Sequence, residues 1–270
     1  MVRRGFSTRR ACELAHLHRA TFQYTERPAS PDELVAELKT LAQRNPRYGY
    51  RRAWAVLKRT RLVNQKRVHR LWKDAQLQVK REPKRRVRRE RVAQLQAQRP
   101  NHIWAYDFVQ DADCYGNTLY ILTVMDEFTR EGLATEVTSE TSAQGVRAVL
   151  EALRDIYGTP TFLRSDNGAE FVAHALGLWL RQHAIEPLYI ARGCRWQNGK
   201  DERFNGTLRD ECLNMQLFGS LIEARIRVEA FRQHYNAQRP HSALGYQTPL
   251  EFKQAWNQAQ NKQQDSLIST

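Results

Sequence analysis

Three acidic residues, Asp107, Asp166 and Glu202, occupy positions where carboxylates could bind divalent cations. Asp107 falls inside an aromatic and aliphatic run, WAYDFV, which predicts a buried strand. Asp166 follows a second apolar run and precedes Asn167 and Gly168, at the strand end where ligand sites of α/β sheets concentrate. Glu202 lies near the start of a predicted helix, and positions 167 to 201, 35 residues, separate it from Asp166.

Each of these acids also has an ordinary structural explanation. Asp166 could belong to a simple turn, and Glu202 could only favour the positive end of its helix. Together, however, they form a set of hard oxygen ligands suited to Mg²⁺ or Mn²⁺. Two such ions, about 3.5–4 Å apart, can activate an attacking oxygen and neutralise a leaving one. We therefore expect Asp107, Asp166 and Glu202 to be both the catalytic residues and the metal ligands.

The elements that must position these acids begin after Pro100. Strands are predicted at 102–111, 119–128 and 132–139, with a hairpin turn at 115–117. Helix and strand then alternate: a helix at 141–157, a strand at 161–166, a helix at about 170–183, a strand at 185–190, and helices at 200–214 and 221–236. A three-strand meander followed by this alternation predicts a mixed α/β sheet. The Gln-rich tail after Trp256 is expected to be flexible.

The charge of the chain is divided between its two parts. Residues 1–100 contain 27 Lys and Arg against 8 Asp and Glu, whereas the other 170 contain 16 against 21, within a net charge of +14. This division suggests a polyanion-binding module joined to a part that handles cations, although a solvated basic surface is the simpler alternative.

No apolar run approaches the roughly 18 residues of a membrane span, and the four cysteines form no CxxC pair, so we expect a soluble, intracellular protein with free thiols. Cys12, His16 and His18 raise a zinc alternative that lacks a second cysteine pair.

The basic part divides into helical segments and a linker. Residues 7–24 resemble a helix-turn-helix, capped by Ser7 or Thr8 and closed by Leu17 and Phe22. A second module at 32–77 contains three amphipathic segments. Its candidate DNA-binding residues are Arg51, Arg52, Lys66 and Arg67. The run KREPKRRVRRER at 80–91 is expected to lie along a phosphate backbone through Arg85, Arg86, Arg88 and Arg89.

Four segments, taken in order, resemble a known family. They are WAYDFV (104–109), SDNGAEF (165–171), WQNGKDERFNGTLRDECLN (196–214) and YNAQRPHSALGYQTPLEF (235–252). They resemble the catalytic domain of DDE transposases and retroviral-type integrases, most of all the second reading-frame (OrfB) product of two-frame bacterial insertion sequences. RRACELAHLHRATFQY and PRYGYRRAWAVLKR match the same family, so the resemblance spans nearly the whole chain.

The resemblance implies a fold and a set of roles. The fold would be an α/β RNase H-like core, a mixed five-stranded sheet flanked by helices, preceded by all-α helix-turn-helix modules. Asp107, Asp166 and Glu202 would bind two Mg²⁺ (or Mn²⁺) ions per active site. The residues implied in DNA contact are Asn198 and Gly199 before the catalytic helix, Arg209 two turns after Glu202, and Arg239 and His241, which with Pro240 would shape the site's rim or meet DNA. Asp126 and Arg130 match family positions that we interpret as structural.

The sequence departs from the family pattern just before Glu202. The usual pattern has a proline-glycine and more apolar residues before the glutamate, whereas Lys200, Asp201 and, directly after Glu202, Arg203 are unusually polar here. Asp201 is therefore a second carboxylate that could reach the metal, although the spacing favours Glu202.

The resemblance predicts a DNA transposase that catalyses metal-dependent cleavage and strand transfer at insertion-sequence ends. Its expected partners are double-stranded DNA (element ends and target), further copies of the chain in a homodimer or higher oligomer, and a possible upstream-frame protein. The resemblance places the protein in the bacterial cytoplasm, and on the nucleoid when it is bound to DNA. A non-enzymatic DNA-binding regulator and a nuclease of the same fold are the alternatives. The predicted domains are a helix-turn-helix (1–27), a second helical DNA-binding module (28–78), a basic linker (79–100), the catalytic domain with its C-terminal helices (101–256) and a flexible tail (257–270).

Overall fold

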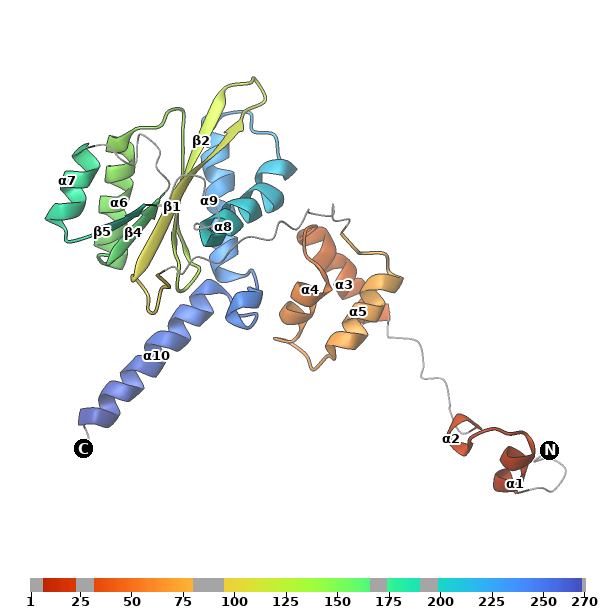
Figure 1. The fold of residues 1–270 in the computed structure, drawn as a ribbon. Coiled ribbons are helices and arrows are strands. Elements are labelled where there is room, and N and C mark those ends of the chain that lie inside the picture. Colours follow the sequence, from red (N-terminus) through yellow and green to blue (C-terminus); the bar gives the residue numbers. More distant parts are fainter. Residues whose placement is uncertain (1–6, 23–31, 80–94, 166–173, 190–198, 269–270) are drawn as a thin grey trace.

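A mixed sheet of five strands forms the centre of the larger domain (Figure 1). The computed structural model describes residues 7–22, 32–79, 95–165, 174–189 and 199–268. The strands are β1 (Ile103–Ala112), β2 (Thr118–Asp126), β3 (Gly132–Thr138), β4 (Phe162–Ser165) and β5 (Glu186–Tyr189), in the order β3-β2-β1-β4-β5. The first three are antiparallel, and β4 and β5 run parallel to β1. The predicted meander and mixed sheet are confirmed.

Helices cover both faces of this sheet (Figure 1). One face packs on α6 (Ala143–Tyr157) and α7 (His174–Gln182), and the other on α8 (Gly199–Glu211) and α9 (Leu221–Ala237). Side chains alternate along β1: Trp104 and Tyr106 join the α6/α7 core, whereas Ala105 and Val109 join the α8/α9 core. Asp107 has the parity of Ala105 and Val109, so the strand directs it toward α8.

The last helix corrects one expectation. Residues after Trp256, predicted to be a flexible tail, continue the helix α10 (Pro249–Ile268), which projects from the domain in Figure 1. Phe252 and Trp256 anchor its beginning by ring contacts with Phe128, at centroid distances of 5.5 and 4.7 Å. Glutamine is a good helix former, so the run beyond Trp256 can extend a helix that tertiary contacts have begun.

The second helical module forms the three helices that the sequence predicts. They are α3 (Asp32–Arg44), α4 (Tyr50–Leu57) and α5 (Gln65–Asp74). Their apolar stripes meet in one core that includes Leu38, Ala53, Leu57 and Trp72. Asn64 caps α5 by accepting a hydrogen bond from the Lys66 N–H at 2.8 Å.

The N-terminal pair confirms the predicted helices but not their core. Ser7 caps α1 (Thr8–Leu14), and α2 (Arg19–Phe22) follows. Leu17 and Phe22, expected to close a small core, are 41% and 48% exposed. A four-residue helix offers too little surface to cover both side chains. No helix in the described ranges is long and apolar enough to cross a membrane.

Candidate active site

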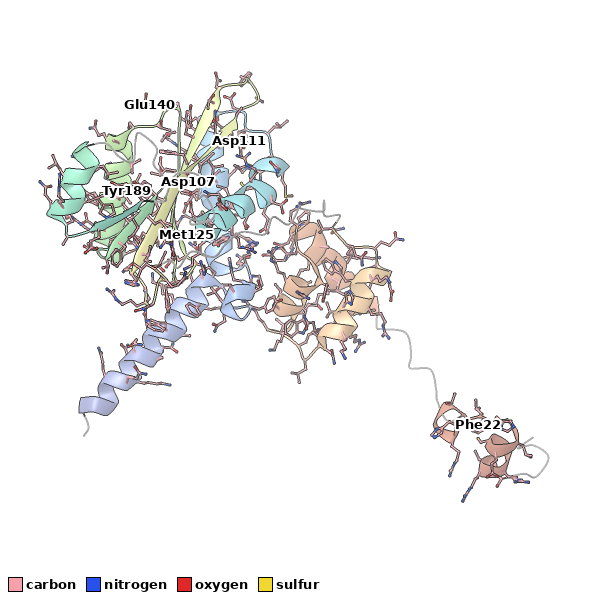
Figure 2. The ribbon with its side chains drawn as sticks, viewed as in Figure 1. Phe22, Asp107, Asp111, Met125, Glu140 and Tyr189 are labelled. Atoms are coloured by element: carbon pink, nitrogen blue, oxygen red, sulfur yellow. The ribbon has the colours of Figure 1, made fainter. Side chains whose placement is uncertain are left out.

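Asp107 lies in the middle of the central strand, half-buried against α8 (Figure 2). Its Oδ1 accepts the N–H of Phe108 at 2.8 Å, and its Oδ2 accepts the side-chain amide of Asn205, on α8, at 3.1 Å. Thr123, opposite Asp107 on β2, places its hydroxyl 3.1 Å from the Asp107 carbonyl oxygen and 2.9 Å from Asn205 Oδ1. The carboxylate is therefore held in one orientation by two strands and a helix.

The first turn of α8 supplies two more carboxylates. Asp201 is fully buried, and its Oδ2 accepts the second amide hydrogen of Asn205 at 3.2 Å. Glu202 is exposed on the same turn. Both acids lie at the positive end of the helix, which stabilises their charge. Asn205 thus bridges Asp107 and the start of α8. Sequence reasoning missed it, although its place three residues after Glu202 puts the two on neighbouring helix positions.

The third predicted acid, Asp166, lies outside the described residues, as do Asn167, Gly168 and Asn198. The strand that leads to it is described: β4 runs parallel to β1 with Ala105 paired to Arg164, and ends at Ser165. Within the described ranges no three His, Cys, Asp or Glu side chains gather closely enough to hold a metal ion. Gly199, the other predicted loop residue, begins α8.

A buried ionic cluster connects β4 with the first turn of α8. The Glu127 carboxylate accepts hydrogen bonds from Arg164 at 2.5 Å and from Lys200 at 2.9 Å. Burial lowers the pKa of Lys200, and Glu127 opposes this shift. The unusual polarity before Glu202 therefore has a structural cause, since Lys200 and Asp201 both bond to groups inside the domain.

Two predicted structural residues form the turn after β2. Asp126 accepts hydrogen bonds from the N–H groups of Asn101, Phe128 and Thr129 at 2.7 to 2.9 Å. Burial raises the pKa of Asp126 against these donors. Arg130 adopts a positive φ of 63° in the same turn, and burial lowers its pKa. Their interpretation as structural residues agrees with these contacts.

Two residues expected at the rim or on DNA are instead buried. Arg239 donates to both oxygens of Glu211, at 2.7 and 2.8 Å, and its guanidinium lies 5.5 Å from the Tyr235 ring centroid. Burial and the neighbouring Arg239 lower the pKa of His241 to about 3, so its imidazole is neutral at physiological pH. Arg239 is therefore bonded to Glu211 at the end of α8, and His241 lies beside Arg239, so a role of either residue at the rim or on DNA stays a prediction. Pro240, between them, is also buried.

The other predicted DNA contacts divide by exposure. Arg209 is exposed on α8 and donates to the Gln110 carbonyl of β1 at 2.7 Å. Arg51, Lys66 and Arg67 are exposed on the helical module. Arg52 is half-buried in an ion pair with Glu211 at 3.0 Å, so its place on DNA stays a prediction. Four further candidates lie outside the described residues, namely Arg85, Arg86, Arg88 and Arg89.

The five-stranded mixed sheet and its covering helices match the integrase core class. Models of the integrase core domain match residues 97–194 and 183–249. A model of an HTH-like domain matches residues 30–86, the second helical module rather than residues 1–27. The cryoEM structure of a simian T-cell lymphotropic virus intasome in complex with the PP2A regulatory subunit B56 gamma is similar, with a TM-score of 0.51 and 14% identity over 71% of this chain and 67% of that one. This likeness supports an RNase H-like integrase fold.

Sequence relatives narrow the class to a family. The uncharacterized 31.7 kDa protein of insertion element IS407 from Burkholderia multivorans is 41% identical over 253 residues, 92% of this chain and 91% of that protein. Transposase InsD of insertion element IS2 from Escherichia coli is 31% identical over 225 residues, 77% of this chain and 73% of that protein. The chain belongs to the insertion-sequence transposases with an integrase-like core.

Proposed function

We propose that this chain catalyses metal-dependent cleavage and strand transfer at the ends of its insertion sequence, with Asp107, Asp166 and Glu202 as the metal ligands. The observation that carries this proposal is the half-buried Asp107 carboxylate, held by Asn205 beside the first turn of α8, which carries Asp201 and Glu202. A carboxylate on the central strand of a sheet requires a strong compensating partner, and a divalent cation is such a partner.

The residues present fit Mg²⁺ or Mn²⁺. Asp107 and Glu202 offer the hard oxygen donors that these ions prefer, on elements that meet at α8. β4 ends one residue before Asp166, in parallel pairing with β1. A pair of such ions, when bound, would lower the pKa of the attacking oxygen and neutralise the leaving one.

The chain's own contribution to the reaction is placement. Asn205 and the Phe108 N–H orient Asp107, and the α8 N-terminus stabilises the charge of Glu202. In the first step a water oxygen bonds to phosphorus at the element's end, the bond to the 3′ oxygen breaks, and that oxygen leaves as a 3′-OH. In the second step this 3′-OH bonds to the phosphorus of another phosphodiester and displaces its 3′ oxygen. No covalent protein intermediate is required, because preorganised charge lowers both barriers.

DNA binding is assigned to two surfaces. On the HTH-like module, α5 presents an exposed basic face made of Lys66, Arg67, Arg70 and Lys73. The last helix of a helix-turn-helix reads the major groove, so α5 is the proposed recognition helix. On the catalytic core, Arg209 is exposed on the helix of Glu202 and is proposed to contact the terminal nucleotides. Two ends must be joined, so the active complex is proposed to contain at least two copies, with or without the upstream-frame protein.

The test is a joining assay. Purified protein is incubated with labelled DNA carrying the element's ends, in Mg²⁺, Mn²⁺ or EDTA, beside the Asp107→Ala, Asp166→Ala and Glu202→Ala variants. Metal-dependent joined products that all three variants lose are the expected result. Cleavage without joining would instead indicate a nuclease. DNA binding without chemistry in any metal, even with the upstream-frame protein added, would indicate a regulator.

A further inference from the structure

Glu127 occupies an unusual position for a carboxylate. It directly follows β2 and is 1% exposed, and its backbone N–H donates to the Ile103 carbonyl at 3.0 Å. Its two oxygens accept from different cations, Oε1 from Arg164 and Oε2 from Lys200. Taking a carboxylate out of water is unfavourable by several kcal/mol unless paired donors compensate it. The two ion pairs are therefore needed for Glu127 to be buried as a charge.

The two partners of Glu127 come from distant parts of the sequence. Arg164 is on β4, two positions before Asp166, and Lys200 is in the first turn of α8, two positions before Glu202. A second Arg164 bond, to the Leu95 carbonyl at 2.9 Å, fixes its guanidinium further. One buried carboxylate thus connects the strand that leads to one proposed metal ligand with the helix that carries another.

Rigidity follows from this connection. The salt bridge to Arg164 is almost fully buried, and buried ion pairs tolerate little change in geometry, because a displaced partner leaves an uncompensated charge. Some groups hydrogen-bond to metal ligands and orient them without binding the metal. Altering such a group typically changes metal affinity or activity by about 10- to 100-fold. The cluster is placed to act in this way, since it contacts β4, which leads to Asp166, and the first turn of α8, which bears Glu202, and supplies neither ligand.

We propose that Glu127 is a positioning residue that fixes β4, which ends one residue before Asp166, relative to the start of α8, which bears Glu202, and thereby sets the affinity of the site for its metal ions. The proposal rests on the proposed function for the identity of the ligands. It gives the charge of Lys200 a role, since the ion pairs of Glu127 connect the start of α8 to β4.

The experiment compares Glu127→Gln with Glu131→Gln. Glu131 is the matched control because it is also buried and paired to a lysine, Lys253 at 2.8 Å, but on α10. Hydrogen exchange is measured over residues 199–206 and 162–165, and the Mn²⁺ concentration for half-maximal joining is measured in parallel. For Glu127→Gln we expect about tenfold faster exchange in both segments and a rise of about tenfold or more in the half-saturating Mn²⁺ concentration. The control should change neither.

Lys200 provides a second test if Glu127→Gln fails to fold, because its side chain is partly exposed. Lys200→Met should reproduce the shift in Mn²⁺ dependence, and Lys200→Arg should restore most of it. Unchanged exchange in folded Glu127→Gln, or faster exchange with an unchanged Mn²⁺ dependence, would overturn the positioning role. Wild-type protein that joins no DNA in any metal would overturn the proposed function instead, and the exchange data would still decide whether Glu127 fixes the two segments.

Discussion

The two ends of α8 carry similar acids that have different partners. At its start, Asp201 accepts from the amide of Asn205, which also donates to Asp107. At its end, Asp210 is ion-paired with Arg47, and Glu211 with Arg52 and Arg239. An amide donor orients a carboxylate but leaves its negative charge available to a cation, whereas a bidentate guanidinium neutralises it. The role of an acid on this helix is therefore decided by its partner.

The end of α8 is also where the HTH-like module docks. Besides the pairs to Arg47 and Arg52, the Tyr48 hydroxyl lies 3.2 Å from His234 Nε2, and Arg59 pairs with Glu251 at 2.7 Å. The proposed DNA-binding module therefore contacts the same helix that carries Glu202. Binding of the module to an element end would place the start of α8 relative to that end.

The largest effect is expected from the two acids at the start of α8. Glu202→Gln should reduce joining by at least about a thousandfold, because it removes a charge that the transition state requires. Asp201→Asn should retain most joining, since a buried asparagine can keep the bond to Asn205. The measurement is the rate of joined product under saturating Mn²⁺.

Arg203→Gln, an exposed neighbour in the same turn, is the matched control and should join normally. If Asp201→Asn abolishes joining and Glu202→Gln does not reduce it, the proposed difference between the acids at the two ends of α8 is wrong. Asp201 would then be the third ligand.

At the other end, Glu211→Gln should reduce stability more than activity. Arg239 is 4% exposed and would lose the charge that compensates it, so we expect a loss of about 3 kcal/mol in the free energy of unfolding. Denaturant unfolding measures this loss. At temperatures where the variant is folded, DNA joining should persist.

Asp210→Asn is the control, because its pair with Arg47 is substantially exposed and such pairs contribute about 1 kcal/mol or less. An equal loss of stability in both variants would contradict the burial argument.

The sequence predicted the helices and strands that depend on a local pattern of residues. The alternation in β1 and the short apolar run before Ser165 located the strands, and the periodicity of residues 32–77 located α3 to α5. Long-range pairs could not be predicted: Arg239 and Arg52 looked like exposed cations, because no pattern joins them to Glu211. The same holds for Glu127 with Arg164 and Lys200. The helical state of the tail after Trp256 was not predicted, because α10 is held by a ring contact with Phe128, which is far away in sequence. The place of Asp166 in the site stays a prediction.

The cluster at the end of α8 should also be sensitive to pH through His241. Its folded pKa, about 3, is below the usual value of 6.5, because burial and Arg239 disfavour the cation. The unfolded chain then binds more protons, so this stabilisation is complete above about pH 6.5 and is lost as pH falls toward 3. From pH 7 to pH 5 the wild type should lose about 2 kcal/mol more than His241→Gln.

Unfolding free energies of both proteins at the two pH values provide the test. His234, whose pKa burial also lowers, is common to both proteins and cancels in the difference. Equal losses in the two proteins would show that His241 is protonated as readily in the fold as in the unfolded chain.

The smallest effect distinguishes a docking arginine from a DNA-binding one. Arg52→Met should lower stability by about 1 kcal/mol or less, because Arg52 is half-buried and Glu211 keeps Arg239. It should leave the salt dependence of DNA binding unchanged, since Arg52 already faces a carboxylate. Arg67→Met, on the exposed face of α5, should instead reduce the slope of log affinity against log salt by about 1. Fluorescence anisotropy between 50 and 200 mM salt, about the range in which phosphate contacts are resolved, measures both slopes. If Arg52→Met lowers the slope as much as Arg67→Met, Arg52 leaves Glu211 at the end of α8 and contacts DNA. DNA binding would then couple the two ends of the helix more closely than their separate partners indicate.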